Sequence, residues 1–314
     1  MKYWGARDAR LNIPYNDSLS MNLSDAVTVT TVHFGDYPAD SLVIDDREAR
    51  PAQVARASRH LDHLRRLAET EARARVVSRN SFPMGTGMAS SAAGFAALTV
   101  AASAALALDL SERELSALAR LGSGSACRSI PSGFTLWHAG HDHASSFAET
   151  IAPPEHWDLR DVTAVVSAAH KVVSSAQGHG LADTSPFLAA RLDDLPRRTG
   201  RVLAALAARD IEALGEELEA EAIALHVLAM TSRPPLLYWE PATLEIMQLC
   251  PQWRSEGIAV YFTLDAGPNV HLICEAGQAA AVAQRLGELS SVQATYVNGP
   301  AGAARLTTEH LFVP

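Results

Sequence analysis

Apolar and polar residues alternate in some stretches of the chain and recur at helical spacing in others. Residues 26–33 alternate apolar side chains with Thr, which predicts a strand, and residues 53–72 carry apolar and charged side chains at the period of a helix. The same criteria predict strands over residues 162–168, 258–264 and 270–274 and helices over residues 197–208 and 211–230. Helices and strands are mixed along the chain, so we predict an α+β fold.

The longest apolar stretch covers residues 92–110 and is rich in Ala. Thr99, Ser103 and Asp109 interrupt it, so it predicts a core helix and no membrane span. The preceding residues 83–91 read Pro-Met-Gly-Thr-Gly-Met-Ala-Ser-Ser. Glycines admit a ligand close to the backbone, and free N–H groups at a helix start attract anions. The segment predicts a phosphate-binding loop, with a plain glycine turn before a buried helix as the alternative.

Composition narrows the class of protein. With 314 residues, 48% of them hydrophobic, the chain can bury a large core in one large or two medium domains. The formal net charge of −9 opposes general nucleic-acid binding. Cys127, Cys250 and Cys274 are odd in number and widely spaced, which argues against a disulfide framework or a cysteine metal site. No cationic leader precedes an apolar segment, so we expect a cytoplasmic protein.

Three further segments carry candidate chemistry. Residues 122–128 read Gly-Ser-Gly-Ser-Ala-Cys-Arg, a second hydroxyl-rich turn, and Ser111 with Glu114 forms a capping-box pattern that predicts a short helix leading into it. Asp265 follows a predicted strand and precedes a Gly-Pro-Asn turn. The chain starts with Met-Lys-Tyr-Trp-Gly, which places a cation at Lys2. Two hydroxyl-rich loops suggest two phosphate-bearing ligands.

Taken together, these segments resemble the mevalonate diphosphate decarboxylases of the GHMP kinase superfamily, from the first residue to about residue 308. Ala89-Ser-Ser-Ala-Ala-Gly94 and Gly122-Ser-Gly-Ser-Ala-Cys-Arg-Ser129 are the most specific matches. The resemblance implies a two-lobed fold, with an ATP-binding lobe over residues 1–160, a ferredoxin-like lobe over residues 161–314 and the active site between them. It also implies ATP and Mg²⁺ as cofactors, phosphorylated mevalonate as substrate and a homodimer.

The resemblance assigns roles residue by residue. Such an enzyme phosphorylates a tertiary 3-hydroxyl, after which phosphate leaves and the neighbouring carboxylate is lost as CO₂. Asp265 would orient or deprotonate the hydroxyl, Arg128 would bind the substrate carboxylate or phosphate, and Lys2 would lower the pKa of Asp265. The residues expected to hold the ATP phosphates are Gly85, Gly87, Ala89, Ser90 and Ser91. The residues expected to bind substrate are Tyr3, Ser123, Gly124, Ser125, Arg128 and Ser175.

Each candidate has a plainer interpretation. Asp265 would be a turn-forming residue, Arg128 a surface cation, Ser123 and Ser125 helix caps, and Lys2 part of a disordered end. The joint occurrence of these residues favours the active site. Two other clusters have structural explanations: a solvated loop for His138, His141 and His143, and lobe packing for Tyr238 and Trp239.

The sequence departs from the family at two cations. The family usually reads Tyr-Trp-Gly-Lys where this chain has Ala6, and some bacterial members have Arg where it has Ala176. Without both cations a diphosphate would bind less well, so we favour mevalonate 5-phosphate as substrate and isopentenyl phosphate as product, with His179 as a weaker, pH-dependent contact. Mevalonate 5-diphosphate is the alternative. A mevalonate 3-kinase or a non-catalytic binding protein ranks lower, because members that only phosphorylate lack the Asp, Lys and Arg set.

A last departure is at the beginning of the chain. The family carries a strand ending in Asn-Ile-Ala before Lys-Tyr-Trp-Gly, whereas this sequence opens at Met1-Lys2. Either this start is late or the strand is absent, and if the strand is absent we expect Lys2 to be poorly held.

Overall fold

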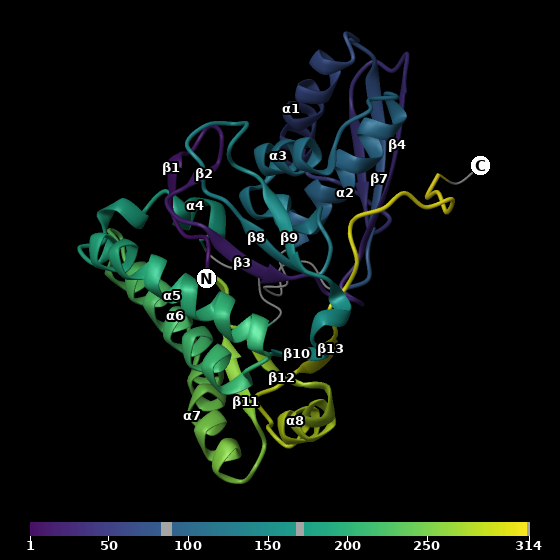
Figure 1. Cartoon of the computed structure of the whole chain (residues 1–314). Coiled ribbons are helices and arrows are strands. Elements are labelled where there is room, and N and C mark those ends of the chain that lie inside the picture. Colours follow the sequence, from purple (N-terminus) through teal and green to yellow (C-terminus); the bar gives the residue numbers. More distant parts are fainter. Residues whose placement is uncertain (83–89, 168–172, 313–314) are drawn as a thin grey trace.

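Helices and sheets form two lobes (Figure 1), and residues of both lobes line a cleft between them. The computed structural model describes residues 1–82, 90–167 and 173–312, without the side chain of residue 176. The predicted α+β class is confirmed. Within these residues no helix is both long and apolar enough to cross a membrane.

The N-terminal lobe contains three antiparallel or mixed sheets, ordered β1-β2, β3-β8-β9 and β4-β7-β5-β6. Its strands are β1 (Ala6–Asp8), β2 (Ile13–Pro14), β3 (Ser18–Met21), β4 (Thr28–Gly35), β5 (Ser41–Ile44), β6 (Arg47–Glu48), β7 (Arg73–Asn80), β8 (Phe134–Trp137) and β9 (Ala148–Ala152). Its helices are α1 (Pro51–Leu67), α2 (Ser90–Ala105), α3 (Glu112–Gly122) and the 3-10 helix η1 (Gly124–Ser129). The apolar faces of α1, α2 and α3 pack on β7 around Leu61, Leu64 and Val76.

The local signals of this lobe define its elements closely. β4 lies within two residues of the predicted strand, and α1 ends five residues before the prediction, at Leu67. The capping box at the start of α3 is confirmed: Ser111 Oγ accepts from Glu114 N at 3.3 Å, and Glu114 Oε2 accepts from Ser111 N at 2.8 Å. Because the capping box at Ser111 fixes the start of α3, and α3 ends at Gly122, this helix positions η1 beside the cleft.

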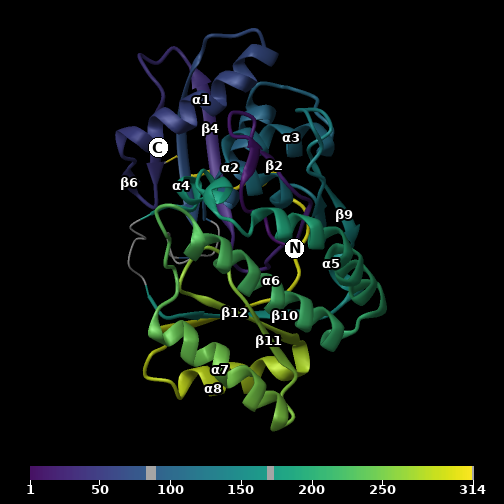
Figure 2. The same ribbon diagram turned by 90° about the vertical axis from the view of Figure 1, so that its left-hand side faces the viewer.

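The C-terminal lobe is an antiparallel sheet of order β11-β12-β10-β13 with helices on both faces (Figure 2). Its strands are β10 (Leu159–Val165), β11 (Val260–Thr263), β12 (Val270–Glu275) and β13 (Ala294–Asn298). Its helices are α4 (Ser175–His179), α5 (Leu188–Ala208), α6 (Ile211–Thr231), α7 (Pro241–Ser255) and α8 (Ala279–Gly287), and short 3-10 turns are η2 (Pro154–His156), η3 (Ala182–Thr184) and η4 (Ala276–Gln278). The predicted pairing of the two strands around Asp265 is confirmed.

Alternation along these strands separates two environments. Val162, Val260 and Leu272 point to the core that α7 and α8 cover. The intervening residues face α5, α6 and the cleft, where Ile273 packs near Leu214. The side chains that line the cleft from this sheet therefore come from alternate positions of β10, β11 and β12.

Two elements of the C-terminal lobe begin before their predicted limits. β10 begins at Leu159, three residues before the prediction, and the predicted last residue of that strand lies outside the described residues. α5 begins at Leu188 and continues through Pro196, because Arg191 and Leu195 are buried and anchor its first turns.

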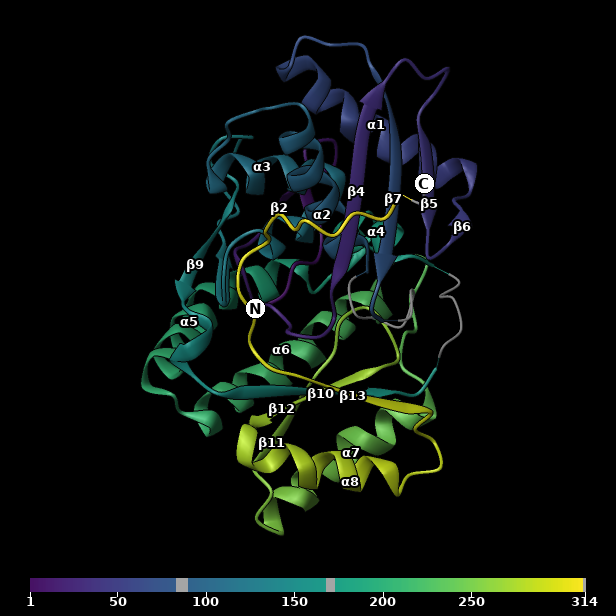
Figure 3. The ribbon, with the colours of Figure 1, turned by 90° about the vertical axis from the view of Figure 1, so that its right-hand side faces the viewer.

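The last described residues return to the N-terminal lobe. Residues 299–312 cross over β4 (Figure 3), with Ala301 N donating to Asn22 O at 3.0 Å and Leu311 N donating to Thr31 Oγ1 at 2.9 Å. The chain end thus ties the two lobes together, and the expected boundary near residue 160 stays a prediction.

Close packing of α6 on β11 requires a glycine, which gives a testable prediction. A Cβ at Gly215 would lie 2.0 Å from the Tyr261 ring, whereas one at Gly200 of α5 would have no neighbour within 4 Å. Gly215→Ala should lower the free energy of unfolding by about 1–3 kcal/mol, and Gly200→Ala should raise it by up to about 1 kcal/mol. Urea unfolding of both variants measures this, and equal effects would contradict the packing.

Candidate active site

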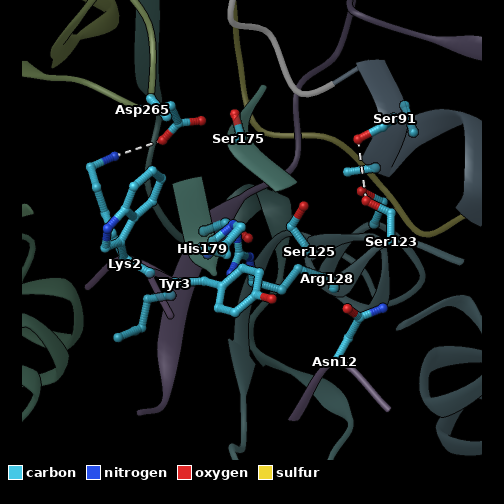
Figure 4. A pocket seen from close by; sticks show the side chains of 18 of the residues that line it. Lys2, Tyr3, Asn12, Ser91, Ser123, Ser125, Arg128, Ser175, His179 and Asp265 are labelled. Atoms are coloured by element: carbon cyan, nitrogen blue, oxygen red, sulfur yellow. Dashed lines mark hydrogen bonds and ion pairs between the residues drawn. The ribbon is translucent and has the colours of Figure 1, made fainter. Parts of the chain in front are cut away.

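The cleft between the lobes has a volume of about 1650 Å³. It is lined by the first residues of the chain, the start of α2, the end of α3 with η1, α4, and the turn between β11 and β12 (Figure 4). The candidate residues of the described segments lie along it.

Lys2 and Asp265 form the centre of this arrangement. Lys2 Nζ lies 2.8 Å from Asp265 Oδ1. Asp265 sits in the turn between β11 and β12, and its neighbours Leu264 and Ala266 are buried, so the carboxylate between them turns to the cleft. Its side chain is 51% exposed and that of Lys2 16%. The predicted proximity of the two charges is confirmed.

The backbone of Lys2 is fixed by three hydrogen bonds. Lys2 N donates to Glu221 Oε1 at 3.1 Å, and Lys2 O accepts from Asn16 Nδ2 at 3.1 Å and from Arg191 Nη2 at 3.0 Å. Arg191 is itself paired with the buried Glu221 of α6. The expectation that Lys2 is poorly held is therefore wrong, because contacts from both lobes hold it.

Surrounding cations control the charge of Asp265. Enclosure in the cleft raises the pKa of the Asp265 carboxyl, but Lys2 above all, then His271 and Arg128, outweigh it and hold the pKa well below its usual range. Asp265 is therefore an anion near neutral pH. Such a weak base can orient a hydroxyl and take its proton late, as that oxygen becomes bonded to phosphorus.

Arg128 belongs to η1 and is not a surface cation. Its Nη1 donates to Ser18 Oγ at 2.5 Å, and the guanidinium lies 5.7 Å from the centre of the Trp137 ring. Its Nε is buried and has no hydrogen-bond partner among the described residues. A half-buried guanidinium with an unused Nε–H beside the cleft suits a carboxylate, which can accept two parallel bonds.

The two hydroxyl-rich loops meet. Ser91 Oγ, in the first turn of α2, lies 3.2 Å from Ser123 Oγ at the end of α3. Ser123 makes no side-chain cap bond, so its hydroxyl faces its neighbour and the cleft. Ser90 and Ser125 also line the cleft. The other candidates of the first loop, Gly85, Gly87 and Ala89, lie outside the described residues.

An aromatic stack closes one side of the cleft. The rings of Tyr3 and His179 stack at 4.0 Å, and a Cβ at Gly124 would lie 2.7 Å from Tyr3, so glycine there leaves room for the ring. Gly5 N donates to His179 Nδ1 at 3.0 Å. Burial, and then Arg128, lower the pKa of His179 to about 3. The expected pH-dependent contact is therefore wrong: His179 is neutral with its proton on Nε2.

Ser175 begins α4 above His179 in Figure 4 and lines the cleft. The preceding Ser174 caps the helix by accepting from Gln177 N at 3.3 Å. Ser175 is thus left to face the cleft while its neighbour performs the capping.

Several residues that line the cleft were not predicted from the sequence. Arg56, Arg59 and His63 of α1 do so, and their spacing of three and four residues was a detectable helical face. His271 also lines it, and its signal was a lone His in an otherwise apolar strand. These residues bring further charge into the cleft.

The histidine cluster of residues 138–143 lies in a loop, and the neighbouring aromatic residues Tyr238 and Trp239 pack in the core, as predicted. His138 bonds Glu149 at 2.7 Å in a loop, and Arg120 Nη2 lies 2.9 Å from His143 Nδ1. Tyr238 and Trp239 pack against separate core clusters. In the described segments no group of three or more His, Cys, Asp or Glu side chains could hold a metal ion.

Comparison with known proteins agrees with this geometry. A family model described as "Diphosphomevalonate decarboxylase-like N-terminal domain" matches residues 1–148, and one described as "Mevalonate 5-diphosphate decarboxylase C-terminal domain" matches residues 162–305. The diphosphomevalonate decarboxylase of Eremothecium gossypii is 37% identical over 87% of this chain and 74% of its own length. The phosphomevalonate decarboxylase of Haloferax volcanii is 33% identical over 87% of this chain and 84% of its own.

Solved structures are similar to this chain over both lobes as well. The mevalonate diphosphate decarboxylase from Enterococcus faecalis aligns with a TM-score of 0.89 and 36% identity, covering 96% of this chain and 93% of that one. The two-lobed fold, with these matches over both lobes, shows that the chain belongs to the mevalonate diphosphate decarboxylase family of the GHMP kinase superfamily. It is an ATP-dependent decarboxylase.

The first prediction from this site concerns Asp265. Asp265→Asn removes the anion beside Lys2 and should lower kcat by about two orders of magnitude or more, the usual scale for a group that handles a reacting proton. The fold and ATP affinity should be retained, because the side chain is half exposed. Asp193→Asn, an exposed position on α5, is the matched control. Near-normal turnover of Asp265→Asn would contradict the role.

The second prediction concerns the planar guanidinium of Arg128. Arg128→Lys keeps the charge but loses the parallel donors, so kcat/KM should fall about tenfold or more, the effect of losing one charge-assisted hydrogen bond. Arg285→Lys on α8 is the control for the same exchange away from the cleft. Equal rates for Arg and Lys at position 128 would show that only charge is needed there.

Proposed function

We propose that this enzyme converts mevalonate 5-phosphate to isopentenyl phosphate, with ATP as phosphoryl donor and with ADP, phosphate and CO₂ as the other products. The observation that carries the substrate choice is Ala6. Its side chain lines the cleft where relatives with Tyr-Trp-Gly-Lys have a cation. A terminal phosphate would meet a methyl group there.

The next residue does not replace the missing cation. Arg7 is exposed, and its guanidinium donates to Gly140 O at 3.2 Å and to Tyr15 O at 3.5 Å. Arg7 is also not among the residues that line the cleft. His179, on the same side, is neutral and offers one Nε2–H donor. This supports a pocket built for less negative charge than a diphosphate carries.

Mevalonate 5-diphosphate is the second candidate, and the names of relatives favour it. Those from Eremothecium gossypii, Aspergillus fumigatus and humans are named diphosphomevalonate decarboxylases, against phosphomevalonate decarboxylase for that of Haloferax volcanii. Arg59 and Arg10 also line the cleft and are cations available to a second phosphate. Substrate choice thus depends on whether these arginines can contact a second phosphate bound beside Ala6.

The residues of the cleft fit both halves of the reaction. Asp265 would accept a hydrogen bond from the 3-hydroxyl and then its proton as the phosphoryl group arrives. Lys2 would stabilise the charge developing on that group. Arg128 would hold the substrate carboxylate until the phosphate ester leaves, and the bond to the carboxylate then breaks, so that its electron pair forms the C=C bond and CO₂ departs.

The hydroxyls would hold phosphates. Ser123 and Ser125 of the second loop, with Tyr3 and Ser175 opposite, would bind the 5-phosphate. Ser90 and Ser91 begin α2, whose free N–H groups favour an anion, so this end suits the ATP phosphates. A solved relative binds MVAPP, AMPPCP and magnesium. In this chain Mg²⁺ would rest chiefly on phosphate oxygens, since the described part holds no cluster of three or more ligating side chains. Mg²⁺ would neutralise phosphate charge there.

Two other hypotheses have less support: a kinase that does not decarboxylate and a binding protein without catalytic activity. A mevalonate 3-kinase lacks the Asp, Lys and Arg set, whereas here Lys2 contacts Asp265 and Arg128 lowers its pKa. The same charge arrangement argues against a purely structural binding protein. The homodimer and the cytoplasmic location stay predictions.

Restoring the missing cation tests the substrate choice. The enzyme should have a higher kcat/KM for mevalonate 5-phosphate than for the 5-diphosphate, and Ala6→Lys should shift that ratio towards the diphosphate by about tenfold or more, the effect of one charge-assisted contact. Steady-state kinetics with both substrates measure the ratio. Ala6→Met, of similar length without charge, should leave the preference unchanged.

The simplest test of substrate choice is the preference of the wild-type enzyme between mevalonate 5-phosphate and the 5-diphosphate. If it prefers the diphosphate by about tenfold or more, a difference of about 1.4 kcal/mol, other donors bind the second phosphate and the interpretation of Ala6 is wrong.

A further inference from the structure

A second buried charged group lies beneath the Lys2–Asp265 pair. His271 of β12 and Asp161 of β10 are 8% and 4% exposed, and His271 Nδ1 lies 2.8 Å from Asp161 Oδ2. Thr163 Oγ1 is 3.2 Å from Asp161 Oδ1 and 3.2 Å from His271 Nδ1. These three side chains form a closed hydrogen-bonded group on the cleft face of the sheet.

Strand pairing fixes this group next to the catalytic turn. His271 is the register partner of Thr163 on one side and of Thr263 on the other. Asp265 follows Thr263 by two residues. His271, Asp161 and Thr263 all line the cleft. The imidazole therefore lies under the turn that carries the carboxylate.

The hydrogen bonds determine how the imidazole is protonated. An ionised Asp161 only accepts, so His271 Nδ1 carries a proton and donates it. His271 Nε2 is buried and has no hydrogen-bond partner among the described residues. A buried carboxylate stays charged only beside a cation. Burial alone would lower the pKa of His271, but Asp161, and then Asp265, outweigh it and raise the pKa above its usual range.

The other charged groups around the imidazole come from the N-terminal segment, η1, α6 and α8. Lys2 lowers the pKa of His271, and Arg128 acts on Asp265 from η1. On α6, Glu221 is paired with Arg191 and Glu217 with Arg201. α8 covers the opposite face of the sheet, where its Arg285 is paired with Glu256. Asp161 and Asp265 are thus the anions that face His271 directly.

We propose that His271, held as an imidazolium by Asp161, is a positioning residue that acts through Asp265 and supports full turnover only while it is protonated. Its charge lies on the cleft face of the sheet, next to the turn that carries Asp265, and offsets the negative charge that accumulates when phosphates enter the cleft. The proposal rests on the proposed function for its assay, and concerns a residue to which that function assigns no role.

The sign of the pH effect follows from the raised pKa. Below the pKa of His271 the cation is present and activity is full, and activity falls as the pH rises through that pKa. Loss of the charge should lower kcat/KM about tenfold. Asp265 contributes no change in this range, because its pKa lies far below it.

The first experiment measures kcat/KM against pH, between about pH 6 and pH 10, with whichever phosphorylated mevalonate the enzyme converts. The wild type should lose activity on the alkaline side with a pKa above 6.5. Asp161→Asn keeps the hydrogen bond without the charge, so its alkaline limb should move down by about one pH unit or more. His271→Gln should have no such limb. Asp158→Asn, with a 72% exposed side chain paired with Arg160, is the matched control.

An unchanged alkaline limb in Asp161→Asn or His271→Gln would overturn the proposal. A second measurement does not need turnover: NMR titration of the imidazole protons, assigned by their loss in His271→Gln or by their shift in Asp161→Asn. The pKa of His271 should exceed 6.5 and should fall in both Asp161→Asn and Asp265→Asn, since the coupling is reciprocal. A lower pKa, or one insensitive to both changes, would contradict the proposal even if neither substrate is converted and the proposed function fails.

Discussion

The rest of the site depends on the ion pair between Lys2 and Asp265. The two residues are 263 positions apart, and their contact forms only when the start of the chain lies against the turn between β11 and β12. A half-exposed pair of this kind contributes little to stability. Its importance is electrostatic, because it places an anion and a cation together at the junction of the lobes, where the proposed function transfers a phosphoryl group to a hydroxyl.

Several layers of structure maintain that pair. Glu221, Arg191 and Asn16 fix the backbone of Lys2, and buried neighbours on both sides of Asp265 hold the turn. Arg128 reaches the same region from η1, whose position is set by the capped helix α3 before it. The residues of the site thus come from separate elements, each held by its own local contacts, which keeps the charges in place before any ligand binds.

Features of the fold that depend on short-range patterns are predictable from the sequence. The alternation of β4, the capping box of Ser111 and the strand pair around Asp265 are local signals, and the structure contains all three. The motifs also identified the family. The sequence could not show that Arg191 and Glu221 hold Lys2, because those contacts span the two lobes, nor that His179 is neutral, because its pKa depends on burial.

The central claim is that one site first phosphorylates the 3-hydroxyl and then expels CO₂. The most direct test follows ADP and CO₂ separately after the enzyme is mixed with ATP, Mg²⁺ and mevalonate 5-phosphate or the 5-diphosphate. The charge set of Lys2, Asp265 and Arg128 predicts that both products form in equal amounts with one of the two substrates. ADP without CO₂ would show a kinase, and neither product with either substrate would show that the cleft does not catalyse the reaction.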